Sequence, residues 1–291
     1  MSAPRRLAQG EWSAAYAFSR GAEPLIARFS AYRDDFEKDR FAADRFASPA
    51  LPIPRVLETG EAFDGFYAIS EAAPGRHIDD VSGPELRALL PALFAALDAA
   101  RTASLEGTCG YGVWGAAGNA RHPTWRAALL DVAADGPGRR TSGWRERLAA
   151  SPAGIRPFER AYARLEALTR DVAVGRHLVH SDLLHFNVLV ANTRITAVLD
   201  WGSSLYGDFL YDLAWFRFFA PWFPAAREVD VTEEVLSHWR AVGLAVPDLE
   251  RRMECCLLHI GLDAQAYCAF AGRPAAEIVQ MAARTSEVTA V

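Results

Sequence analysis

The 291-residue chain has few cysteines, and their spacing does not suit a zinc site. Four are present, at Cys109, Cys255, Cys256 and Cys268, and no two of them form a Cys-x-x-Cys pair. No cluster of histidines completes a metal-ligand set with them, which excludes the common zinc folds. Cys255 and Cys256 are adjacent in an apolar helical stretch, which favours buried free thiols over a disulfide. We therefore expect a reduced protein.

Long apolar runs are also missing. The run at 88–100 is among the longest, but it contains Pro91 and Asp98 and is too short to span a bilayer. The first seven residues, M-S-A-P-R-R-L, lack the apolar segment of a secretory signal peptide. From these absences we expect a cytoplasmic protein with no membrane partner.

An excess of positive charge is missing as well. The chain has 31 Lys+Arg and 36 Asp+Glu, a formal net charge of −5, which argues against a protein that binds nucleic acid by neutralising phosphates. Such a surface attracts a cationic small molecule more readily than an anionic one. The hydrophobic fraction of 51% is that of a globular protein. The length predicts two domains or lobes, and we expect a monomer.

The order of the predicted elements gives a strand-rich first part and a helix-rich second part. Apolar alternation between turns predicts strands at 12–19, 25–29, 56–61 and 66–70, and helical spacing predicts a helix at 34–48. Further helices are expected at 83–103, 125–132, 157–170 and over most of the chain after 212, with an irregular glycine-rich segment at 107–118. Short β-like runs at 178–180, 188–190 and 195–199 form a small β insert in the second part.

Three polar residues in this insert have the spacing of a kinase catalytic site. Asp182 and Asn187 stand at a D-x-x-x-x-N spacing in a loop between apolar runs, and Asp200 ends the next run. In a strand–loop–strand hairpin, Asp182 can accept a hydroxyl proton while Asn187 and Asp200 offer oxygen ligands to Mg²⁺. Taken singly, the same residues are typical of turns and of a helix cap. Their joint spacing favours phosphoryl transfer.

The sequence around these residues resembles the aminoglycoside phosphotransferase family, whose fold is related to that of the protein kinases. The resemblance lies in H-S-D-L-L-H-F-N at 180–187 and L-D-W at 199–201, and it covers most of the chain. The family's loop usually reads H-G-D-x-x-x-x-N, so Ser181 stands where glycine is common. Runs at 46–54, 177–180, 194–198 and 259–263 are nearest to the branch that phosphorylates a 4-hydroxyl of hygromycin B.

The resemblance implies an α+β, bilobal, protein-kinase-like fold. Residues 1–74 would form a small, β-rich, nucleotide-binding N-lobe with a five-stranded sheet and one helix. Residues 75–291 would form a larger, mostly helical C-lobe with the catalytic loop and the acceptor pocket. The linker between the lobes would lie at about 70–75.

The implied activity is transfer of the γ-phosphoryl group of Mg·ATP to a hydroxyl of an aminoglycoside antibiotic, hygromycin B favoured, giving antibiotic resistance. Asp182 would be the catalytic base, Asn187 and Asp200 would bind Mg²⁺, and His180 would orient the loop through its hydrogen bonds. His185 is more ambiguous and is expected to be a surface loop residue. Asp208 and Asp212 resemble family acids that brace the loop.

The nucleotide side of the site is expected in the first part of the chain. A kinase-like lobe needs a cation on its third strand and an acid on the following helix. Arg28 is the cation where the family usually has lysine, and Asp39 is the acid, with Glu37 as the alternative. The phosphate loop is expected at 10–14, where Ser13 can contact phosphate. That loop lacks G-x-G-x-x-G, and no P-loop motif occurs in the chain.

The adenine is expected to bond to the backbone of the linker at Glu71–Ala73. Backbone recognition leaves almost no side-chain signature, so GTP stays an alternative to ATP.

A polycationic acceptor calls for carboxylates and aromatic rings in the second part of the chain. Trp201, beside the predicted metal ligand, and Trp222 are the candidate rings, and Asp208, Glu233 and Glu234 are the candidate acids. Asp263 belongs to the same group of acids in the second part. A single tryptophan is more often a core residue, and a glutamate pair is more often a solvated helix face.

Two other functions stay open at this point. The motif does not name the acceptor, so a metabolic kinase for a choline-like, homoserine-like or sugar hydroxyl is the first alternative. A catalytically dead, kinase-like binding protein is the second, favoured by the departures at Arg28 and Ser181 and opposed by the intact Asp182, Asn187 and Asp200.

Overall fold

A computed structural model describes residues 3–183 and 186–289 of the chain, so the prediction for His185 lies outside the described residues. The strands are β1 (Arg5–Gln9), β2 (Ser13–Arg20), β3 (Glu23–Ser30), β4 (Val56–Ala62), β5 (Gly65–Glu71), β6 (Arg76–His77), β7 (Tyr111–Trp114), β8 (Ala120–His122), β9 (His177–Val179), β10 (Val188–Ala191), β11 (Arg194–Val198) and β12 (Leu205–Gly207). The α-helices are α1 (Arg33–Phe46), α2 (Gly83–Thr102), α3 (Trp125–Leu130), α4 (Trp144–Ala150), α5 (Arg156–Leu168), α6 (Leu210–Phe219), α7 (Val231–Ala241), α8 (Leu249–Phe270) and α9 (Ala275–Val288).

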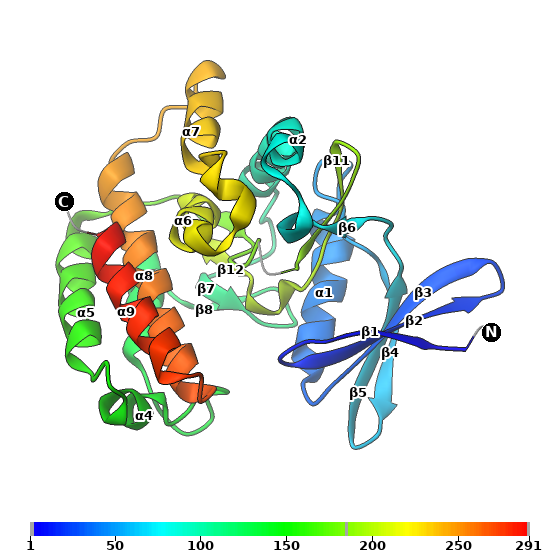
Figure 1. Ribbon diagram of the computed structural model, residues 1–291, viewed down its shortest axis with the longest axis horizontal. Helices are drawn as coiled ribbons and strands as arrows, with labels where there is room; N and C mark the ends of the chain where they lie inside the picture. The colour runs from blue at the N-terminus through cyan, green and yellow to red at the C-terminus, as the bar shows by residue number, and fades with distance from the viewer. Residues whose placement is uncertain (1–2, 184–185, 290–291) are drawn as a thin grey trace.

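The first part of the chain is an antiparallel sheet with α1 beside it (Figure 1). Its strand order is β1-β2-β3-β5-β4, and Arg28 on the central strand β3 pairs with Ala15 and Ala68. The edge strand β1 was not among the strands predicted from the sequence. Its five residues include two arginines, and they show no apolar alternation that would predict a strand.

The helix α1 packs on the second part of the chain as well as on the sheet. Its residues Ala42 and Phe46 are buried in the same apolar core as residues of α2, α6 and α8. Phe41 contacts the ring of Trp114 on β7, with 5.4 Å between the ring centroids. The C-terminal half of α1 is therefore fixed to the helical part of the molecule.

The segment after β5 joins the two parts through a second, small sheet. In this sheet β6 pairs with β10, and β10 pairs with β11, so the linker region is tied to the hairpin that follows Asn187. Thr196 donates a hydrogen bond of 2.5 Å to the carbonyl of Pro74. Gly75 adopts a φ of +125°, and a Cβ there would lie 2.5 Å from the carbonyl oxygen of Val190. Only glycine fits this approach without strain.

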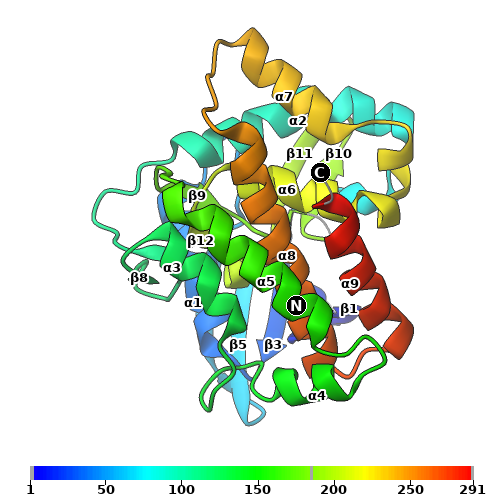
Figure 2. The same cartoon turned by 90° about the vertical axis from the view of Figure 1, so that its left-hand side faces the viewer.

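The second part is mostly helical, with α8 at its centre against α4, α5, α6 and α9 (Figure 2). A third sheet has the order β8-β7-β12-β9, and its strand β9 ends directly before residues 180–200, which we call the catalytic segment. The expectation of an irregular segment at 107–118 was wrong, because it contains β7, and α4 was not predicted. Each is short, four and seven residues, and each lies in a glycine-rich neighbourhood that hides its pattern.

The fold is α+β, with a sheet-rich N-terminal region and a helical C-terminal region, as the resemblance implied. Cys255 and Cys256 are buried free thiols, which confirms that expectation. Among the helices that the structure describes, none combines the length and the apolar character needed to cross a membrane.

Candidate active site

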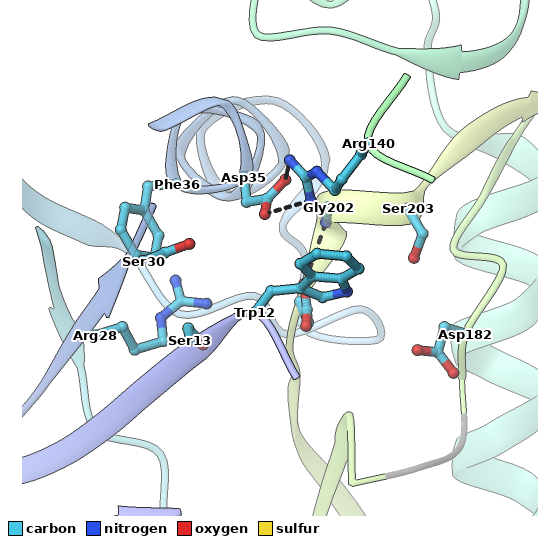
Figure 3. Close-up of a pocket in the computed structure, with 11 residues that line it drawn as sticks. Trp12, Ser13, Arg28, Ser30, Asp35, Phe36, Arg140, Asp182, Gly202 and Ser203 are labelled. Carbon is cyan, nitrogen blue, oxygen red and sulfur yellow. Dashed lines mark hydrogen bonds and ion pairs between the residues drawn. The ribbon is translucent and has the colours of Figure 1, made fainter. Parts of the chain in front are cut away.

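One pocket, of about 160 Å³, gathers several of the predicted site residues (Figure 3). Ser13 and Arg28 reach it from the sheet, and Asp182 and Asp200 reach it from the catalytic segment. Arg28 and Asp182 lie on opposite sides of the pocket in Figure 3. The pocket therefore joins the predicted nucleotide side to the predicted base. Its other lining residues are Trp12, Ser30, Asp35, Phe36, Arg140, Gly202 and Ser203.

Asp212, at the start of α6, accepts hydrogen bonds from the backbone of the catalytic segment. Its two carboxylate oxygens accept the backbone N–H groups of His180 at 3.0 Å and Ser181 at 2.7 Å. Burial raises the pKa of Asp212, and these backbone hydrogen bonds oppose the rise. The described contacts of Asp212 are those of a brace for the loop.

His180 bridges the loop and the next strand. Its Nδ1 accepts the backbone N–H of Asp182 at 3.2 Å, so the proton lies on Nε2, which donates to the carbonyl of Leu199 at 2.8 Å. Both nitrogens of the neutral ring are therefore engaged. These two hydrogen bonds tie the backbone at Asp182 to Leu199, and the orienting role that the resemblance implies for His180 stays a prediction.

Asn187 is turned so that its amide oxygen is left for another partner. Its Nδ2 donates to the backbone carbonyl of Asp182 at 3.0 Å and to the Asp182 carboxylate at 2.9 Å. The Asn187 carbonyl accepts the N–H of Leu199 at 2.7 Å, which places Asp200 just beyond the same end of the hairpin. Two oxygen donors, from Asn187 and Asp200, suit an ion that also takes phosphate and water oxygens.

Ser181 occupies a backbone position that favours glycine. Its φ is +68°, in the left-handed region. In return its hydroxyl donates to the carbonyl of Ser203 at 2.8 Å, a bond that glycine cannot make. The serine therefore links the catalytic loop to the turn that follows Asp200.

Asp200 begins a short 3₁₀ turn, Trp201–Ser203, with a φ of +59°. Its side chain is exposed in the pocket. Desolvation of the carboxylate by the protein around it and the nearby charge of Asp39 raise the pKa of Asp200, while the charge of Arg28 opposes that rise. A carboxylate that solvent reaches but protein surrounds is suited to bind a cation.

The helix α1 carries the acid that meets Arg28. That acid is Asp39, which forms an ion pair with Arg28. The alternative, Glu37, pairs with Arg33. Burial opposes the charge of Arg28, but Asp39 outweighs it and the pKa of Arg28 is raised. The second oxygen of Asp39 accepts the N–H of Trp201 at 2.8 Å. Asp39 therefore connects the strand cation to the turn after Asp200.

Lys38 makes a second connection to this turn and was missed in the sequence. Its Nζ donates to the carbonyls of Gly202 at 2.5 Å and Ser204 at 3.3 Å, and it lies 4.6 Å from the centroid of the Trp114 ring. The residue is 3% exposed, and burial lowers its pKa to about 8. A signal was available, because Lys38 is the only lysine in a chain rich in arginine.

Two of the residues predicted to touch the acceptor are buried, which corrects those predictions. Trp201 is 1% exposed, and its indole N–H donates to the carbonyl of Val198 at 3.2 Å. Asp208 is fully buried and forms a two-pronged ion pair with Arg252, at 2.8 and 2.7 Å. Neither presents a face to a ligand. Asp208 does not touch the loop either, so of the two predicted braces only Asp212 contacts it in the described structure.

The other predicted residues lie outside the pocket that Asp182 lines. Trp222 is 37% exposed on the surface beyond α6. Glu233 and Glu234 are exposed in the first turn of α7, where Glu233 pairs with Arg240. The Glu71 carboxylate pairs with Arg55.

The backbone of the linker presents one candidate donor to a base. The N–H of Glu71 donates to the carbonyl of Arg55 at 3.1 Å, and that of Ala72 donates to Pro24 at 3.3 Å. Ala73 is the next amide along the chain.

One face of α8 leads from the catalytic segment to the nucleotide side. His259 contacts the hydroxyl of Tyr211 at 2.8 Å, beside the brace Asp212. Two and three turns later, Tyr267 and Phe270 contact the ring of Trp12, which lines the pocket. A helix repeats every 3.6 residues, so the face between them carries Asp263.

Asp263 shows the same combination as Asp200. Its side chain is exposed to solvent, and desolvation by the protein around it raises the pKa of the carboxyl to about 6. Burial and the charge of Asp263 raise the pKa of Tyr211, so the Asp263 carboxylate acts on that hydroxyl. In the sequence Asp263 is one of several acids of the second part, and no motif singles it out.

Comparison with known proteins agrees with the geometry of this site. The profile of a phosphotransferase enzyme family matches residues 5–251. The chain is 34% identical to a hygromycin-B 4-O-kinase of Escherichia coli over 259 residues, which are 89% of this chain and 72% of that protein.

Solved structures give the same result. A thermostable mutant of aminoglycoside phosphotransferase APH(4)-Ia, in a ternary complex with AMP-PNP and hygromycin B, superposes with a TM-score of 0.85 at 30% identity, over 99% of this chain and 93% of that one. The spectinomycin phosphotransferase APH(9)-Ia, with ADP and spectinomycin, has a TM-score of 0.58 at 13% identity, over 98% and 88% of the two chains, and shows the fold alone. The chain belongs to the phosphotransferase enzyme family.

Proposed function

We propose that this protein is an ATP-dependent O-phosphotransferase that transfers the γ-phosphoryl group of Mg·ATP to a hydroxyl of an aminoglycoside, with hygromycin B as the favoured acceptor. The observation that carries the proposal is the single pocket lined by Arg28, Asp182 and Asp200. It occurs in a chain that is 34% identical to a hygromycin-B 4-O-kinase.

In this proposal residues 1–74 bind the nucleotide and residues 75–291 bind the acceptor. Arg28, held by Asp39, contacts the α- and β-phosphates, since a guanidinium forms two parallel hydrogen bonds with phosphate oxygens. Ser13 borders the phosphates from β2. The base of ATP, or of GTP as the alternative, bonds to the linker backbone at Glu71–Ala73, with Ala73 as its N–H donor.

The metal site of the proposal consists of the Asn187 amide oxygen and the Asp200 carboxylate. Among the residues that the structure describes, no group of three or more His, Cys, Asp or Glu side chains is arranged to hold a metal ion. A two-ligand site fits Mg²⁺, which keeps phosphate and water oxygens in its shell. Bound there, Mg²⁺ would neutralise charge on the phosphates.

Asp182 is the proposed base. As the acceptor oxygen forms its bond to the γ-phosphorus, the bond from that phosphorus to the bridging oxygen of ADP breaks, and the hydroxyl proton moves to the Asp182 carboxylate. The Asn187 amide, at 2.9 Å, keeps this carboxylate turned toward the pocket. His180 and Asp212 hold the loop that carries it. Their roles are to orient Asp182, not to carry a proton.

The acceptor is proposed to lie against the face of α8 that carries Asp263. A carboxylate one helical turn before Tyr267, whose charge also acts on Tyr211, suits an ammonium group of a polycationic sugar, because the ammonium would offset the burial that raises the pKa of the carboxylate. Trp222, Glu233 and Glu234 remain candidates for the outer edge of the acceptor site. The net charge of −5 favours approach of a cation.

The alternatives are less well supported. A kinase-like binding protein without catalytic activity would not require Asp182, Asn187 and Asp200 in hydrogen-bonded or pocket-lining positions. A metabolic kinase shares the catalytic segment, but the 34% identity extends over 89% of the chain and is to a hygromycin-B kinase. We also propose that the protein acts as a cytoplasmic monomer without a nucleic-acid or membrane partner.

The test is ADP release with Mg·ATP and a panel of acceptors. The panel contains hygromycin B, other aminoglycosides, choline, homoserine and simple sugars. We expect hygromycin B to give the highest kcat/KM. Turnover of the small metabolites alone would reject the antibiotic assignment, and no turnover with any acceptor, by protein that still binds Mg·AMP-PNP, would favour the binding-protein alternative.

A further inference from the structure

Arg140 is an arginine of the second part of the chain that reaches the nucleotide side of the pocket. It lies in the segment between the 3₁₀ turn Asp131–Ala133 and α4. Its guanidinium donates two hydrogen bonds to the Asp35 carboxylate, at 2.9 and 3.0 Å (Figure 3). The side chains of Arg140 and Asp35 are 32% and 17% exposed. The pair spans 105 residues of sequence and joins the helical part to the first turn of α1.

The same guanidinium also contacts two aromatic rings. It lies 3.7 Å from the centroid of Tyr32 and 5.1 Å from that of Trp12. Trp12 precedes β2 and Ser13, in the turn where the phosphate loop is expected, and it packs on Tyr32 with centroids 5.5 Å apart. Arg140 therefore touches both segments of the first part that border the nucleotide side, the turn at Trp12 and the start of α1.

The first turn of α1 lies outside the main apolar core, although Phe36 beside Asp35 is buried. Ala42 and Phe46, in its second half, belong to that core, whereas Asp35 lies at its first turn. Asp35 is also one helical turn before Asp39, which pairs with Arg28 and accepts the N–H of Trp201. A displacement of this turn would move Asp39, and with it Arg28.

We propose that Arg140 is a positioning residue for the nucleotide: it holds the first turn of α1 and the turn at Trp12 over the bound triphosphate. This inference rests on the proposed function. An exposed single ion pair contributes little, but this one is bidentate, half-buried and stacked on two rings, and such pairs are worth more. Arg140 acts through Asp35 and Trp12 and needs no bond to the phosphates.

The test compares Arg140→Ala, Asp35→Asn and the double variant. For each, calorimetry gives the Kd for Mg·AMP-PNP without acceptor, and steady-state kinetics give KM for ATP and for the acceptor. We expect each single variant to raise the Kd and the KM for ATP about five- to tenfold, and to leave the KM for the acceptor within twofold. The double variant should raise the Kd and the KM for ATP no further than Arg140→Ala does, because both changes break the same ion pair.

Two further variants control for general effects. Arg164→Ala removes a bidentate ion pair with Glu254 between α5 and α8, away from the pocket, and should leave both KM values unchanged. Arg140→Lys keeps the charge but loses the planar fork, so it should restore only part of the affinity. Thermal unfolding of every variant shows whether it is folded at the assay temperature.

Three results would overturn the inference. The first is a Kd for Mg·AMP-PNP that Arg140→Ala leaves unchanged, and the second is strict additivity of the two single effects. The third is a large loss in Arg140→Ala with none in Asp35→Asn, which would show that the effect of Arg140 does not pass through its ion pair with Asp35. Failure of wild-type protein to bind Mg·AMP-PNP would reject the proposed function itself, which is a separate outcome.

Discussion

At the scale of single residues, the catalytic segment depends on side chains that hold backbone in positions it would not otherwise keep. Ser181 shows the balance most simply. Its left-handed backbone is strained for any residue but glycine, while its hydroxyl bonds to Ser203 at 2.8 Å. The strain costs about 1 kcal/mol, and one hydrogen bond contributes about 1 kcal/mol. The two effects nearly cancel, so serine can replace the family's usual glycine.

This balance predicts opposite outcomes for two small substitutions. Ser181→Ala keeps the strain and loses the bond, so the free energy of unfolding should fall by about 1 kcal/mol. Ser181→Gly loses the bond but also the strain, and should stay within about 0.5 kcal/mol of wild type. Urea denaturation measures both. Equal destabilisation by the two variants would show that the strain assigned to Ser181 is absent.

His259 predicts a dependence of stability on pH. Burial lowers its pKa from 6.5 to about 4, so between these values the unfolded chain binds a proton that the folded protein does not. The stability is therefore fully present above pH 6.5 and is lost as the pH falls toward 4.

The matched variant is His259→Asn, whose side-chain oxygen can still accept the Tyr211 hydroxyl. Wild type should lose up to about 2 kcal/mol more unfolding free energy than this variant between pH 7 and pH 5. Subtraction of the two curves removes the contributions of all other titrating groups, Asp263 included. Parallel curves would contradict the assignment.

The sequence carries uneven information about the residues of the site, for a physical reason. Asp182, Asn187 and Asp200 could be proposed because the expected chemistry requires a fixed spacing within one short segment; Asp182 and Asp200 line one pocket, and the roles of all three stay predictions. Trp201 and Asp208 could not be assigned correctly, because sequence does not say which way a side chain points, and both are buried. The role of Arg140 depends on a contact over 105 residues, which no local pattern encodes.

At the scale of elements, the linker region is joined to the second part of the molecule by the pairing of β6 with β10. Gly75 has a φ of +125° and passes so close to β10 that a Cβ would lie 2.5 Å from the Val190 carbonyl oxygen. The β6–β10 pairing that it permits ties the linker to the hairpin carrying Asn187.

Gly75→Ala is therefore expected to be worse than an ordinary glycine substitution. Strain at positive φ costs about 1 kcal/mol, and the contact with Val190 should bring the total to about 2 kcal/mol or more. Gly21→Ala is the matched control, because Gly21 has a φ of +66° with nothing within 4 Å of its Cβ position. Equal thermal unfolding of the two variants would show that β10 accommodates the methyl group.

Most elements could be predicted from local patterns. The helices at α1, α2 and α5 have clear apolar spacing, and α2 begins with a Ser82–Glu85 capping box and proline in its first turn. The elements that were missed, β1, β6, β7, β8, β12 and α4, are short and owe their structure to neighbours. β7, for example, pairs with β8 in a hairpin and with β12 from a distant segment.

At the scale of the whole molecule, one pocket brings together basic and acidic side chains from distant parts of the chain. Arg28 comes from the sheet and Arg140 from the segment before α4, while Asp182 and Asp200 come from the catalytic segment. The net charge of −5 is a property of the entire surface and locates none of these side chains. The boundary at 74/75 stays a prediction, since α1 shares its apolar core with the second part.

The central claim is that Asp182 takes the proton of the acceptor hydroxyl. Its direct test is the rate of ADP release by Asp182→Asn with Mg·ATP and the best acceptor of the panel. The amide fits the same space and can still meet Asn187, so Mg·AMP-PNP should bind as in wild type while kcat falls by about 10³-fold or more. Persistence of turnover within tenfold of wild type would contradict the claim and remove Asp182 as the base.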